Sequence, residues 1–384
     1  MSEFAVRIVE ITQPVENHPD ADRLSIVKIG GYLCISGKVE LDPLDENTAY
    51  THRYSVGDKV VYVPEGALVP EYILRDGFWS EKDNKGLLAG SKGNRVKAKR
   101  LRGIFSQGLL LAVSSGDTLT NEAGETRSFN VGDDVSEFLG ITKYEPPIPV
   151  ALAGDVVSIF GNTVKYDFES IQSVVDLFHH GEAVEVTEKL HGTNCQIGYV
   201  PGLNHGEMFG STGDIYVGSK GLSAKGLVMK NNEKNAGNLY VRTLDAMLLA
   251  GLETRLRDMF GNTPVRLFGE VYGKGVQDLS YGLSAPAFAL FDIKVGDAYL
   301  MPDERNEVAE KLEIPVVPIL YRGSYDLDAL IEFRDGKDTI SNSNVREGIV
   351  IRSLESLYHP HHGRKIGKWV SPDYLERRGG TEFN

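Results

Sequence analysis

A proline-rich stretch near the middle of the chain limits what this sequence can fold into. Residues 144–149 read YEPPIP, and three prolines in so short a stretch cannot continue a helix or a central strand. The chain of 384 residues is long enough for two or three domains with cores of their own. We therefore expect two domains, which cover residues 1–145 and 150–384.

The first of these regions carries short alternating apolar runs between turn residues. Residues 4–11 and 60–64 predict strands, and residues 24–35 predict a hairpin around Gly30. Several short strands with turn signals are typical of a small closed β-barrel.

The second region mixes strands with helices, which predicts an α+β domain. Residues 156–159 predict a short strand and residues 171–178 a short helix. The longest helical pattern covers residues 238–259, where leucine and methionine recur near the helical period. Two further helices are predicted at residues 303–312 and 326–333.

One strand of the second region ends in a candidate nucleophile. The alternating run at residues 183–187 leads into residues 188–194, which read EKLHGTN. Lys189 stands at the strand end and Gly192 follows it, so backbone and side chain can both approach a bound nucleotide. Lysine attacks only as a free amine, so such a site must lower its pKa from about 10.4 by burial or by nearby cations. A surface lysine before a hairpin glycine would look the same in this segment alone.

Composition narrows the class of protein. No apolar run approaches the roughly 18 residues of a membrane span, and the first residues lack the features of a secretory signal. The only two cysteines, Cys34 and Cys195, lie far apart in sequence, which fits free thiols in a reducing compartment. We therefore expect an intracellular, cytoplasmic protein with no membrane partner, and the sequence predicts no particular protein partner.

Charge is acidic overall but uneven along the chain. The net charge of −13 argues against indiscriminate binding of polyanions. Basic residues nevertheless crowd residues 92–102 and residues 364–378. These two patches could hold nucleic acid locally or could be solvated surfaces.

Residues 188–194 resemble the nucleotidyl-acceptor motif of the covalent nucleotidyltransferases, which comprise ATP-dependent DNA and RNA ligases and mRNA capping enzymes. The Lys-x-His-Gly form, with His191 where DNA ligases carry aspartate, is similar to that of the double-strand RNA ligases, phage and kinetoplastid enzymes among them. The later motifs of the superfamily are matched in the expected order by residues 217–220 (VGSK), 267–273 (LFGEVYG), 288–293 (FALFDI), 346–352 (REGIVIR) and 367–371 (GKWVS).

The first region also carries a resemblance. Residues 18–24 (HPDADRL) are similar to a tRNA-binding OB module of some tRNA synthetases. A longer series, at residues 61–70, 99–109 and 141–147, resembles the N-terminal OB-like domain of the Deinococcus-type RNA ligases. The resemblances imply an OB-like, nucleic-acid-binding β-barrel followed by a nucleotidyltransferase (ligase adenylation) domain with antiparallel sheets.

The family's reaction has three steps. The lysine attacks the α-phosphate of ATP, AMP passes to an RNA 5′-phosphate, and a 3′-hydroxyl then displaces AMP. The resemblance therefore implies ATP and Mg²⁺ or Mn²⁺ as cofactors and nicked duplex RNA or an RNA–DNA hybrid as partner. Each step is phosphoryl transfer, to which a protein contributes mostly positioning and charge.

The resemblance also assigns roles to residues. Lys189 is the nucleophile, Lys368 contacts the α-phosphate and lowers the pKa of Lys189, and Glu347 binds the metal. Lys220 stands where the family expects arginine, so Lys225 is an alternative, as Lys365 is for Lys368. Glu270 accepts bonds from the ribose, and Phe291, rather than Phe288, stacks on adenine. The implied nucleotide-binding set is Glu188, His191, Gly192, Asn194, Lys220, Glu270, Phe291, Glu347 and Lys365.

Residues 359–362 (HPHH) lack cysteine or carboxylate partners at zinc spacing, so we interpret them as a mobile loop rather than a metal site.

Two alternatives belong to other functional classes. A DNA ligase or capping enzyme is disfavoured by His191 and by the short sequence after Lys368, which leaves no room for the C-terminal OB domain of those enzymes. An RNA- or tRNA-binding protein with an inactive ligase-like domain is disfavoured because Lys189, Glu270, Glu347 and Lys368 are all present.

Overall fold

The computed structural model describes residues 4–41, 49–114, 116–145, 152–377 and 380. Most of the chain divides into two compact units. The N-terminal unit holds residues 2–145 with 172–175, and the C-terminal unit holds residues 146–171 and 176–384. The proline-rich linker expected at residues 144–149 lies largely outside the described residues.

The N-terminal unit is built from short antiparallel strands. One three-stranded sheet contains β1 (Arg7–Glu10), β7 (Lys59–Val63) and β13 (Leu109–Ala112). A second contains β2 (Glu16–Asn17), β3 (Leu24–Ile29) and β4 (Tyr32–Gly37). The hairpin expected around Gly30 is confirmed, since β3 pairs with β4 and Gly30 has a φ of +56°.

The remaining strands of this unit form two-stranded pairs. They are β5 (Val39–Glu40) with β6 (Tyr50–Thr51), β8 (Ala67–Leu68) with β16 (Thr142–Lys143), β9 (Trp79–Ser80) with β10 (Lys85–Gly86), β11 (Lys99–Leu101) with β12 (Ile104–Ser106), and β14 (Thr118–Thr120) with β15 (Thr126–Ser128). Two one-turn helices accompany them, α1 (Glu71–Leu74) and α2 (Ser136–Leu139). Among the described strands, hydrogen-bonded pairing is divided among these separate sheets.

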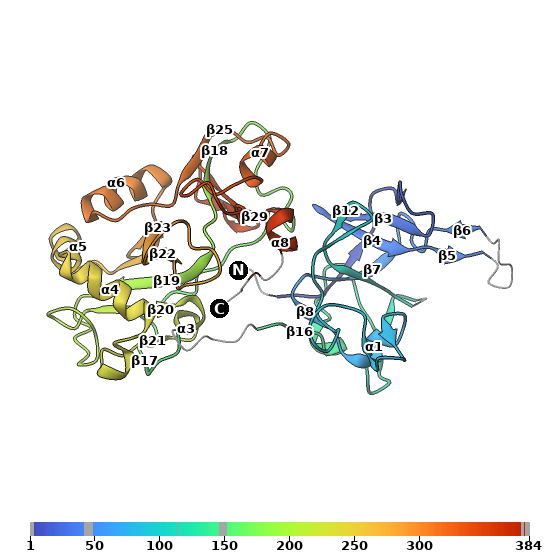
Figure 1. The fold of residues 1–384 in the computed structure, drawn as a ribbon, viewed down its shortest axis with the longest axis horizontal. Coiled ribbons are helices and arrows are strands. Elements are labelled where there is room, and N and C mark those ends of the chain that lie inside the picture. Colours follow the sequence, from blue (N-terminus) through green and yellow to red (C-terminus); the bar gives the residue numbers. More distant parts are fainter. Residues whose placement is uncertain (1–3, 42–48, 115, 146–151, 378–379, 381–384) are drawn as a thin grey trace. The chain divides into compact units, whose positions relative to one another are not determined.

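The C-terminal unit contains two larger antiparallel sheets (Figure 1). The four-stranded sheet has the order β25 (Ile319–Ser324), β18 (Ala183–Glu188), β26 (Gly348–Ser353) and β29 (Ile366–Val370). The five-stranded sheet has the order β20 (Ile215–Ser219), β19 (Gly192–Tyr199), β22 (Val265–Gly273), β23 (Pro286–Val295) and β24 (Ala298–Tyr299). The antiparallel sheets and the mixed α+β class agree with the expectation.

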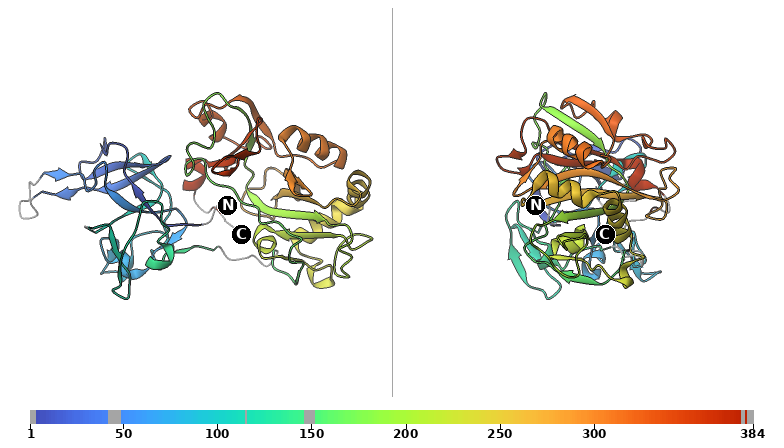
Figure 2. Two further views of the ribbon diagram at one scale, coloured as in Figure 1. Left: turned by 180° about the vertical axis from the view of Figure 1, so that it is seen from behind. Right: turned by 90° about the vertical axis from the view of Figure 1, so that its left-hand side faces the viewer.

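Helices cover one face of the five-stranded sheet (Figure 2). The helical pattern at residues 238–259 is two helices, α4 (Leu239–Leu249) and α5 (Leu252–Phe260), because Gly251 adopts a φ of +89° between them. Asn238 caps α4 by accepting bonds from the amides of Tyr240 and Val241. The third long helix, α6 (Pro302–Leu312), confirms the prediction for residues 303–312.

Two helix predictions were wrong in whole or in part. Residues 171–178 form turns instead of a helix, and residues 326–333 contain only the one-turn helix α7 (Ile331–Arg334). The strand expected at residues 156–159 is β17 (Val156–Ser158), which pairs with β21 (Leu227–Met229). The remaining elements are α3 (Lys220–Ala224), η1 (Glu233–Asn235), β27 (Tyr358–His359), β28 (Gly363–Arg364) and α8 (Pro372–Glu376).

Both cysteines are buried free thiols. In the described part of the chain, no helix combines the length and the apolar character that a membrane crossing requires.

Candidate active site

Lys189 lies at the end of β18, beside the start of the neighbouring strand β26. Its backbone amide donates to the carbonyl of Gly348 at 3.0 Å. Its Nζ lies 2.5 Å from Oε1 of Glu347, and the lysine side chain is 26% exposed. The strand pairing therefore joins the candidate nucleophile to the carboxylate that the sequence motifs placed 158 positions away.

The pKa of Lys189 is shifted in the direction opposite to the one expected from the sequence. Burial alone would lower the pKa of Lys189, but the carboxylates of Glu347 and Glu270 outweigh burial and raise it. The pKa that is lowered belongs to Lys368, which falls to about 8 through burial and through the charges of Lys220 and Lys189, against the opposing effect of Asp167. In this structure, Lys189 is therefore an ion-paired ammonium.

Lys220 and Lys368 both lie near the carboxylate of Asp167, which belongs to none of the sequence motifs. Nζ of Lys220, the first residue of α3, lies 2.8 Å from Oδ1 of Asp167. Burial would raise the pKa of Asp167, but the charges of Lys220 and Lys368 outweigh it and lower the pKa. The segment that carries Asp167 is fixed to β29, because the amide of Lys368 donates to the carbonyl of Glu169 at 3.0 Å.

The five-stranded sheet contributes Glu270 and Asn194 to the group of residues around Lys189. Glu270 on β22 is paired in register with Asn194 on β19. Burial raises the pKa of Glu270 to about 8, although the cation of Lys189 acts to lower it. The Oδ1 atom of Asn194 is buried and has no hydrogen-bond donor in the structure. Gly192 permits the close approach of β22, since a Cβ there would lie 2.1 Å from the carbonyl oxygen of Val271.

Glu188, the last residue of β18, presents a second unsatisfied acceptor. Its Oε2 accepts bonds from the amide and the hydroxyl of Thr339, at 2.9 and 2.5 Å. Its Oε1 is buried without a hydrogen-bond donor. Burial raises the pKa of Glu188, and the Thr339 bonds partly offset that effect. Burying an acceptor without a hydrogen-bond donor costs free energy. A ligand that donates a hydrogen bond to Oε1 would therefore remove this cost on binding.

His191 is held on both ring nitrogens. Nε2 lies 2.8 Å from Oδ1 of Asp278, and Nδ1 lies 2.7 Å from the hydroxyl of Tyr374. Since an ionised carboxylate only accepts, Nε2 carries the proton and Tyr374 donates to Nδ1. The amide of His191 donates to the hydroxyl of Tyr281 at 2.7 Å, and burial lowers the pKa of His191. The ring therefore anchors the loop after Lys189 instead of pointing an unused nitrogen at a ligand.

The two candidate aromatic residues differ in position. Phe288 is buried in the core that packs beneath α4, so it is a core residue. Phe291 is half-buried, and its ring lies 5.5 Å from that of Tyr166. Of the two, Phe291 is the one with a partly exposed ring.

Lys365 is not part of this group. Its Nζ lies 2.5 Å from Oε1 of Glu182, just before β18, whereas Lys189 lies just after the same strand. Six strand residues separate these positions by about 20 Å. His359 and His362 stack on each other in the β27–β28 hairpin, and His362 lies 3.0 Å from Asp176.

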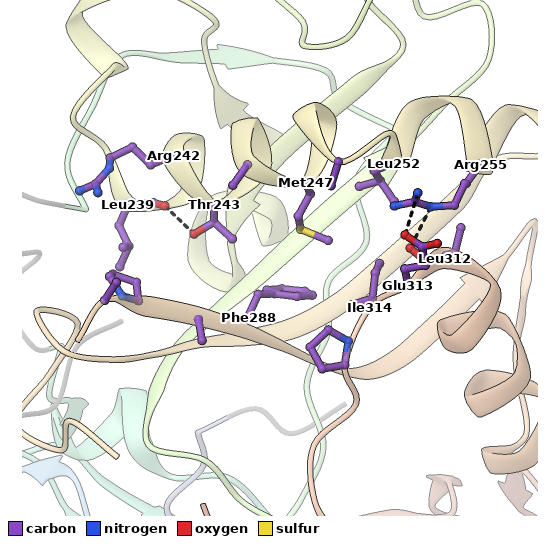
Figure 3. Close-up of a pocket in the computed structure, with 16 residues that line it drawn as sticks. Leu239, Arg242, Thr243, Met247, Leu252, Arg255, Phe288, Leu312, Glu313 and Ile314 are labelled. Atoms are coloured by element: carbon purple, nitrogen blue, oxygen red, sulfur yellow. Dashed lines mark hydrogen bonds and ion pairs between the residues drawn. The ribbon is translucent and has the colours of Figure 1, made fainter. Parts of the chain in front are cut away.

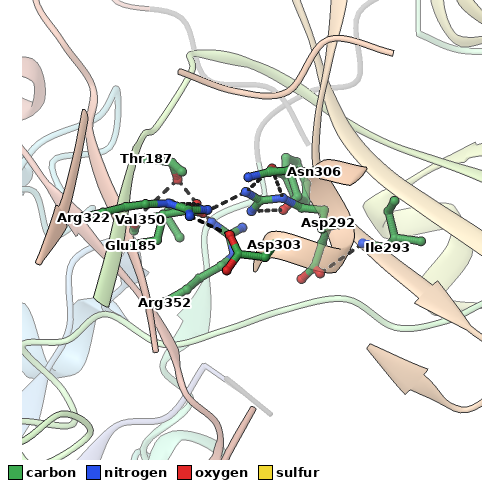
Figure 4. Close-up of polar contacts among 11 residues, drawn as sticks. Glu185, Thr187, Asp292, Ile293, Asp303, Asn306, Arg322, Val350 and Arg352 are labelled. Atoms are coloured by element: carbon green, nitrogen blue, oxygen red, sulfur yellow. Dashed lines mark hydrogen bonds and ion pairs between the residues drawn. The ribbon is translucent and has the colours of Figure 1, made fainter. Parts of the chain in front are cut away.

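An ionic network centres on the buried Glu185 of β18, the strand that ends before Lys189 (Figure 4). Oε1 of Glu185 lies 2.8 Å from Arg305 of α6, and Oε2 lies 2.6 Å from Arg322 of β25. Glu185 and Arg305 are 0% and 1% exposed. Arg352 lies opposite Glu185 on β26 and donates to Thr187 at 3.1 Å.

A cavity lies elsewhere in the C-terminal unit, between α4 and β23 (Figure 3). It encloses about 350 Å³ and is lined mainly by apolar side chains, among them Met247, Phe288 and Ile314. Phe288 faces this cavity, while its neighbour Ala289 is paired with Glu270. Because neighbouring strand residues face opposite sides, the cavity lies behind the sheet and away from Lys189.

The site lies in a segment that matches a known protein family. Residues 182–370 match the protein-family model described as RNA ligase, and this segment contains Lys189, Glu270, Glu347 and Lys368. No curated protein matches the sequence.

The fold resembles solved structures of Naegleria gruberi RNA ligase. The form with pyrophosphate has a TM-score of 0.71 and 24% identity, over 98% of this chain and 98% of that chain. An arginine-to-alanine mutant with ATP and manganese has a TM-score of 0.72 and 24% identity, over 97% and 98% of the two chains. A lysine-to-methionine mutant with AMP and manganese has a TM-score of 0.70 and 24% identity, over 97% and 98%.

The fold over nearly the whole chain is therefore that of an RNA ligase. With the family match across the segment that holds the site, residues 182–370 form an enzyme domain of the RNA ligase family.

Proposed function

We propose that this chain is an ATP-dependent ligase that seals 3′-hydroxyl/5′-phosphate nicks in duplex RNA or in an RNA–DNA hybrid. Lys189 forms an N–P bond to the α-phosphorus of ATP, the bridging P–O bond breaks, and pyrophosphate leaves. AMP then passes to the RNA 5′-phosphate and is displaced by the 3′-hydroxyl. The observation that carries the proposal is the placement of Lys189 among Glu347, Glu270, Lys220 and Lys368.

The charges suit a nucleotide triphosphate. Lys220 and Lys368 supply positive charge for the phosphates, which Lys220 presents as a point charge where the family has the bidentate arginine. The unsatisfied Oε1 of Glu188 suits an amino group of the base, and Glu270 suits ribose hydroxyls. Phe291 offers its partly exposed ring to adenine. The Naegleria ligase structures with ATP, AMP and manganese support the same choice of cofactors.

The carboxylates fit a divalent metal that the substrate helps to hold. In the part of the chain that the structure describes, no group of three or more His, Cys, Asp or Glu residues could bind a metal alone. Mg²⁺ commonly takes one or two carboxylates and completes its shell with phosphates and water. Glu347 is the first candidate ligand, and a bound Mg²⁺ or Mn²⁺ would neutralise phosphate charge.

The Lys189–Glu347 ion pair has a consequence for activation. A cation bound at the Glu347 oxygen that contacts Lys189 would compete with the ammonium for the charge of that carboxylate. Loss of the contact would remove the main influence that raises the pKa of Lys189. Metal binding and generation of the free amine are therefore expected to be linked.

Further proposals concern the subfamily and the N-terminal unit. We infer that the chain belongs with the Deinococcus-type RNA ligases and that its N-terminal unit is an OB-like module that holds RNA. The sequence series at residues 61–70, 99–109 and 141–147 supports both. The basic residues of positions 92–102 supply charge for phosphates.

The first test is transfer of label from nucleotide to protein. Incubation with ATP labelled at the α-phosphate and with Mg²⁺ or Mn²⁺ is expected to label the denatured protein, whereas γ-labelled ATP leaves it unlabelled. Label from GTP alone would favour a capping enzyme. No label from any nucleotide would contradict the proposal and leave the RNA-binding alternative.

The second part of the test concerns the nucleic acid. Nicked duplexes whose 3′-hydroxyl strand ends in ribose are expected to be sealed faster than duplexes ending in deoxyribose. Equal sealing of the two would contradict the assignment to RNA.

Nucleotide affinity is expected to fall as the pH rises from 7 to 9. The pKa values of Lys368 and Glu270 both lie at about 8, so Lys368 loses positive charge and Glu270 gains negative charge in this range. Each change disfavours a polyphosphate and should weaken binding about tenfold over the two pH units. An ATP analogue with a methylene group between the α- and β-phosphorus allows equilibrium binding to be measured by calorimetry.

Two variants separate these contributions. In Lys368→Arg, nucleotide affinity should fall only about tenfold between pH 7 and 9, because arginine stays charged. In Glu270→Gln, the tenfold decrease due to Glu270 should be absent instead. An affinity independent of pH in the wild type would show that the charges of neither group act on the bound nucleotide.

A further inference from the structure

The turn after β17 presents an exposed aromatic ring beside α3. Phe160 is 85% exposed, whereas Ile159 before it is 5% exposed and packs into the core. A single exposed apolar side chain needs no explanation by itself. Phe160 differs because the backbone around it is firmly fixed.

The fixed backbone rests on buried polar groups. The carbonyl of Asn162 accepts bonds from Arg266, at 3.0 and 3.3 Å, and from the hydroxyl of Tyr216 at 3.1 Å. Arg266 and Tyr216 are 8% and 0% exposed. The amide of Ile159 donates to the carbonyl of Gly226 at 2.9 Å. The backbone of the turn that carries the exposed ring of Phe160 is therefore rigid.

The ring of Phe160 also packs on backbone. A Cβ at Gly226 would lie 3.0 Å from Cδ2 and 3.2 Å from Cα of Phe160. Gly226 has a φ of +75°, so glycine suits both the conformation and the contact. The aromatic side chain thus lies close to the end of α3 with its remaining surface in solvent.

The same segment runs from Phe160 back to the candidate active site. Thr163 donates to the carbonyl of Ser223 at 2.7 Å, and Asp167 pairs with Lys220 at 2.8 Å. The chain therefore passes along α3 from its end to its first residue. The four helical steps from Lys220 to Ala224 rise about 6 Å, and the two residues that follow the helix, Lys225 and Gly226, can extend the chain by up to about 7 Å more. A nucleic-acid strand covers that distance in about three nucleotides, at about 3.4 Å each.

A cation accompanies the ring. Lys225 follows α3 directly and is exposed, and in the described part of the chain it makes no ion pair. Lys225 is the chain neighbour of Gly226, on which Phe160 packs. A ring and an ammonium on one such turn are suited to a nucleotide strand, since the ring contacts base or ribose and the ammonium contacts phosphate.

We propose that Phe160 and Lys225 form a docking surface for the RNA strand, about three nucleotides from the reacting phosphate. This inference rests on the proposed function and adds a contact for the RNA beyond the nucleotide-binding residues. The ring takes the apolar face of a base or ribose, and Lys225 takes a nearby phosphate.

The test compares Phe160→Ala with the wild type in sealing of nicked RNA by enzyme that already carries AMP. The variant is expected to require about 5- to 150-fold more RNA for half-maximal rate, which is the range for loss of one stacked base. Phe160→Trp should restore affinity. Lys225→Gln should weaken binding and reduce the slope of log affinity against log salt by about 0.9.

Two measurements keep the outcomes apart. Lysine labelling by α-labelled ATP should be the same in Phe160→Ala as in the wild type, and so should the thermal unfolding midpoint. Substrates shortened to two nucleotides on one side of the nick, tested on each side in turn, should abolish the difference between variant and wild type on the side that docks.

Normal labelling with unchanged RNA affinity in Phe160→Ala would overturn the inference while leaving the proposed function intact. An equal loss of labelling in the variant would also overturn it, because the residue would then act on the nucleotide step. A wild type that takes no label would instead refute the proposed function itself.

Discussion

Replacing Lys189 with alanine is expected to reduce transfer of AMP to the protein to background. The label is held by a bond to Nζ, and Lys189 is the lysine that β18 places among two carboxylates and two further cations. The measurement is retention of α-label on denatured protein after incubation with ATP and Mg²⁺ or Mn²⁺. Lys311→Ala is a matched control, because Lys311 is an exposed lysine on α6 and should leave labelling unchanged.

The same variant should retain later chemistry. Given RNA whose 5′ end already carries AMP, Lys189→Ala is expected to join the strands, since no new bond to lysine is then required. Full labelling of Lys189→Ala would show that another amine is the nucleophile, and Lys368, with its lowered pKa, would be the next candidate. This outcome would overturn the assignment of the two lysines without affecting the fold.

Glu347→Gln tests the role of the ion pair. If Glu347 only held Lys189 as an ammonium, removal of its charge would favour the free amine and raise the rate of labelling. If Glu347 also binds the metal, the rate should fall by about 100-fold or more, which is the scale for loss of one group that stabilises a transition state. We expect the fall.

The parts of the fold that the sequence predicted are those governed by local pattern. The α6 helix follows from Pro302 near its start, and the β3–β4 hairpin follows from Gly30. The helix expected at residues 238–259 was split because Gly251 can leave the helical region. The site lysines and glutamates were found because each stands in a short motif that resembles one of the nucleotidyltransferase motifs.

The residues that the sequence did not reveal act through distant contacts. Asp167 pairs with Lys220 across 53 positions, and Tyr374 reaches His191 across 183. Neither belongs to a motif, and an aspartate in a loop or a tyrosine in a short helix carries no signal of its own. The pKa of Lys189 was predicted in the wrong direction for a similar reason, since the balance between burial and carboxylates depends on distances that only the fold sets.

Removal of the Glu185 charge is expected to destabilise the C-terminal unit by about 3–5 kcal/mol. In Glu185→Gln, Arg305 keeps its charge in a position that is 1% exposed but loses its carboxylate. Breaking one side of a buried ion pair typically costs this amount, because the remaining charge is desolvated without compensation. Glu207→Gln is a suitable control in the same unit, since its pair with Lys230 is 41% and 30% exposed and should contribute at most about 1 kcal/mol.

Tryptophan fluorescence allows this measurement to be made on one unit. The chain has only two tryptophans, and Trp79 belongs to the N-terminal unit while Trp369 belongs to the C-terminal unit. In a Trp79→Phe background, urea unfolding followed at Trp369 reports on the C-terminal unit. A free energy of unfolding within 1 kcal/mol of the background would show that Arg305 finds another partner.

The double variant Glu185→Leu with Arg305→Met separates charge from packing. Replacing both members of a buried pair with apolar residues is often neutral or stabilising, so the double variant should recover most of the stability that Glu185→Gln loses. Glu185 lies on the strand that ends at Lys189, and Arg305 donates to the carbonyl of Phe291 at 3.3 Å. If the double variant is stable but is labelled slowly by ATP, the network serves to position Lys189 and Phe291 as well as to stabilise the fold.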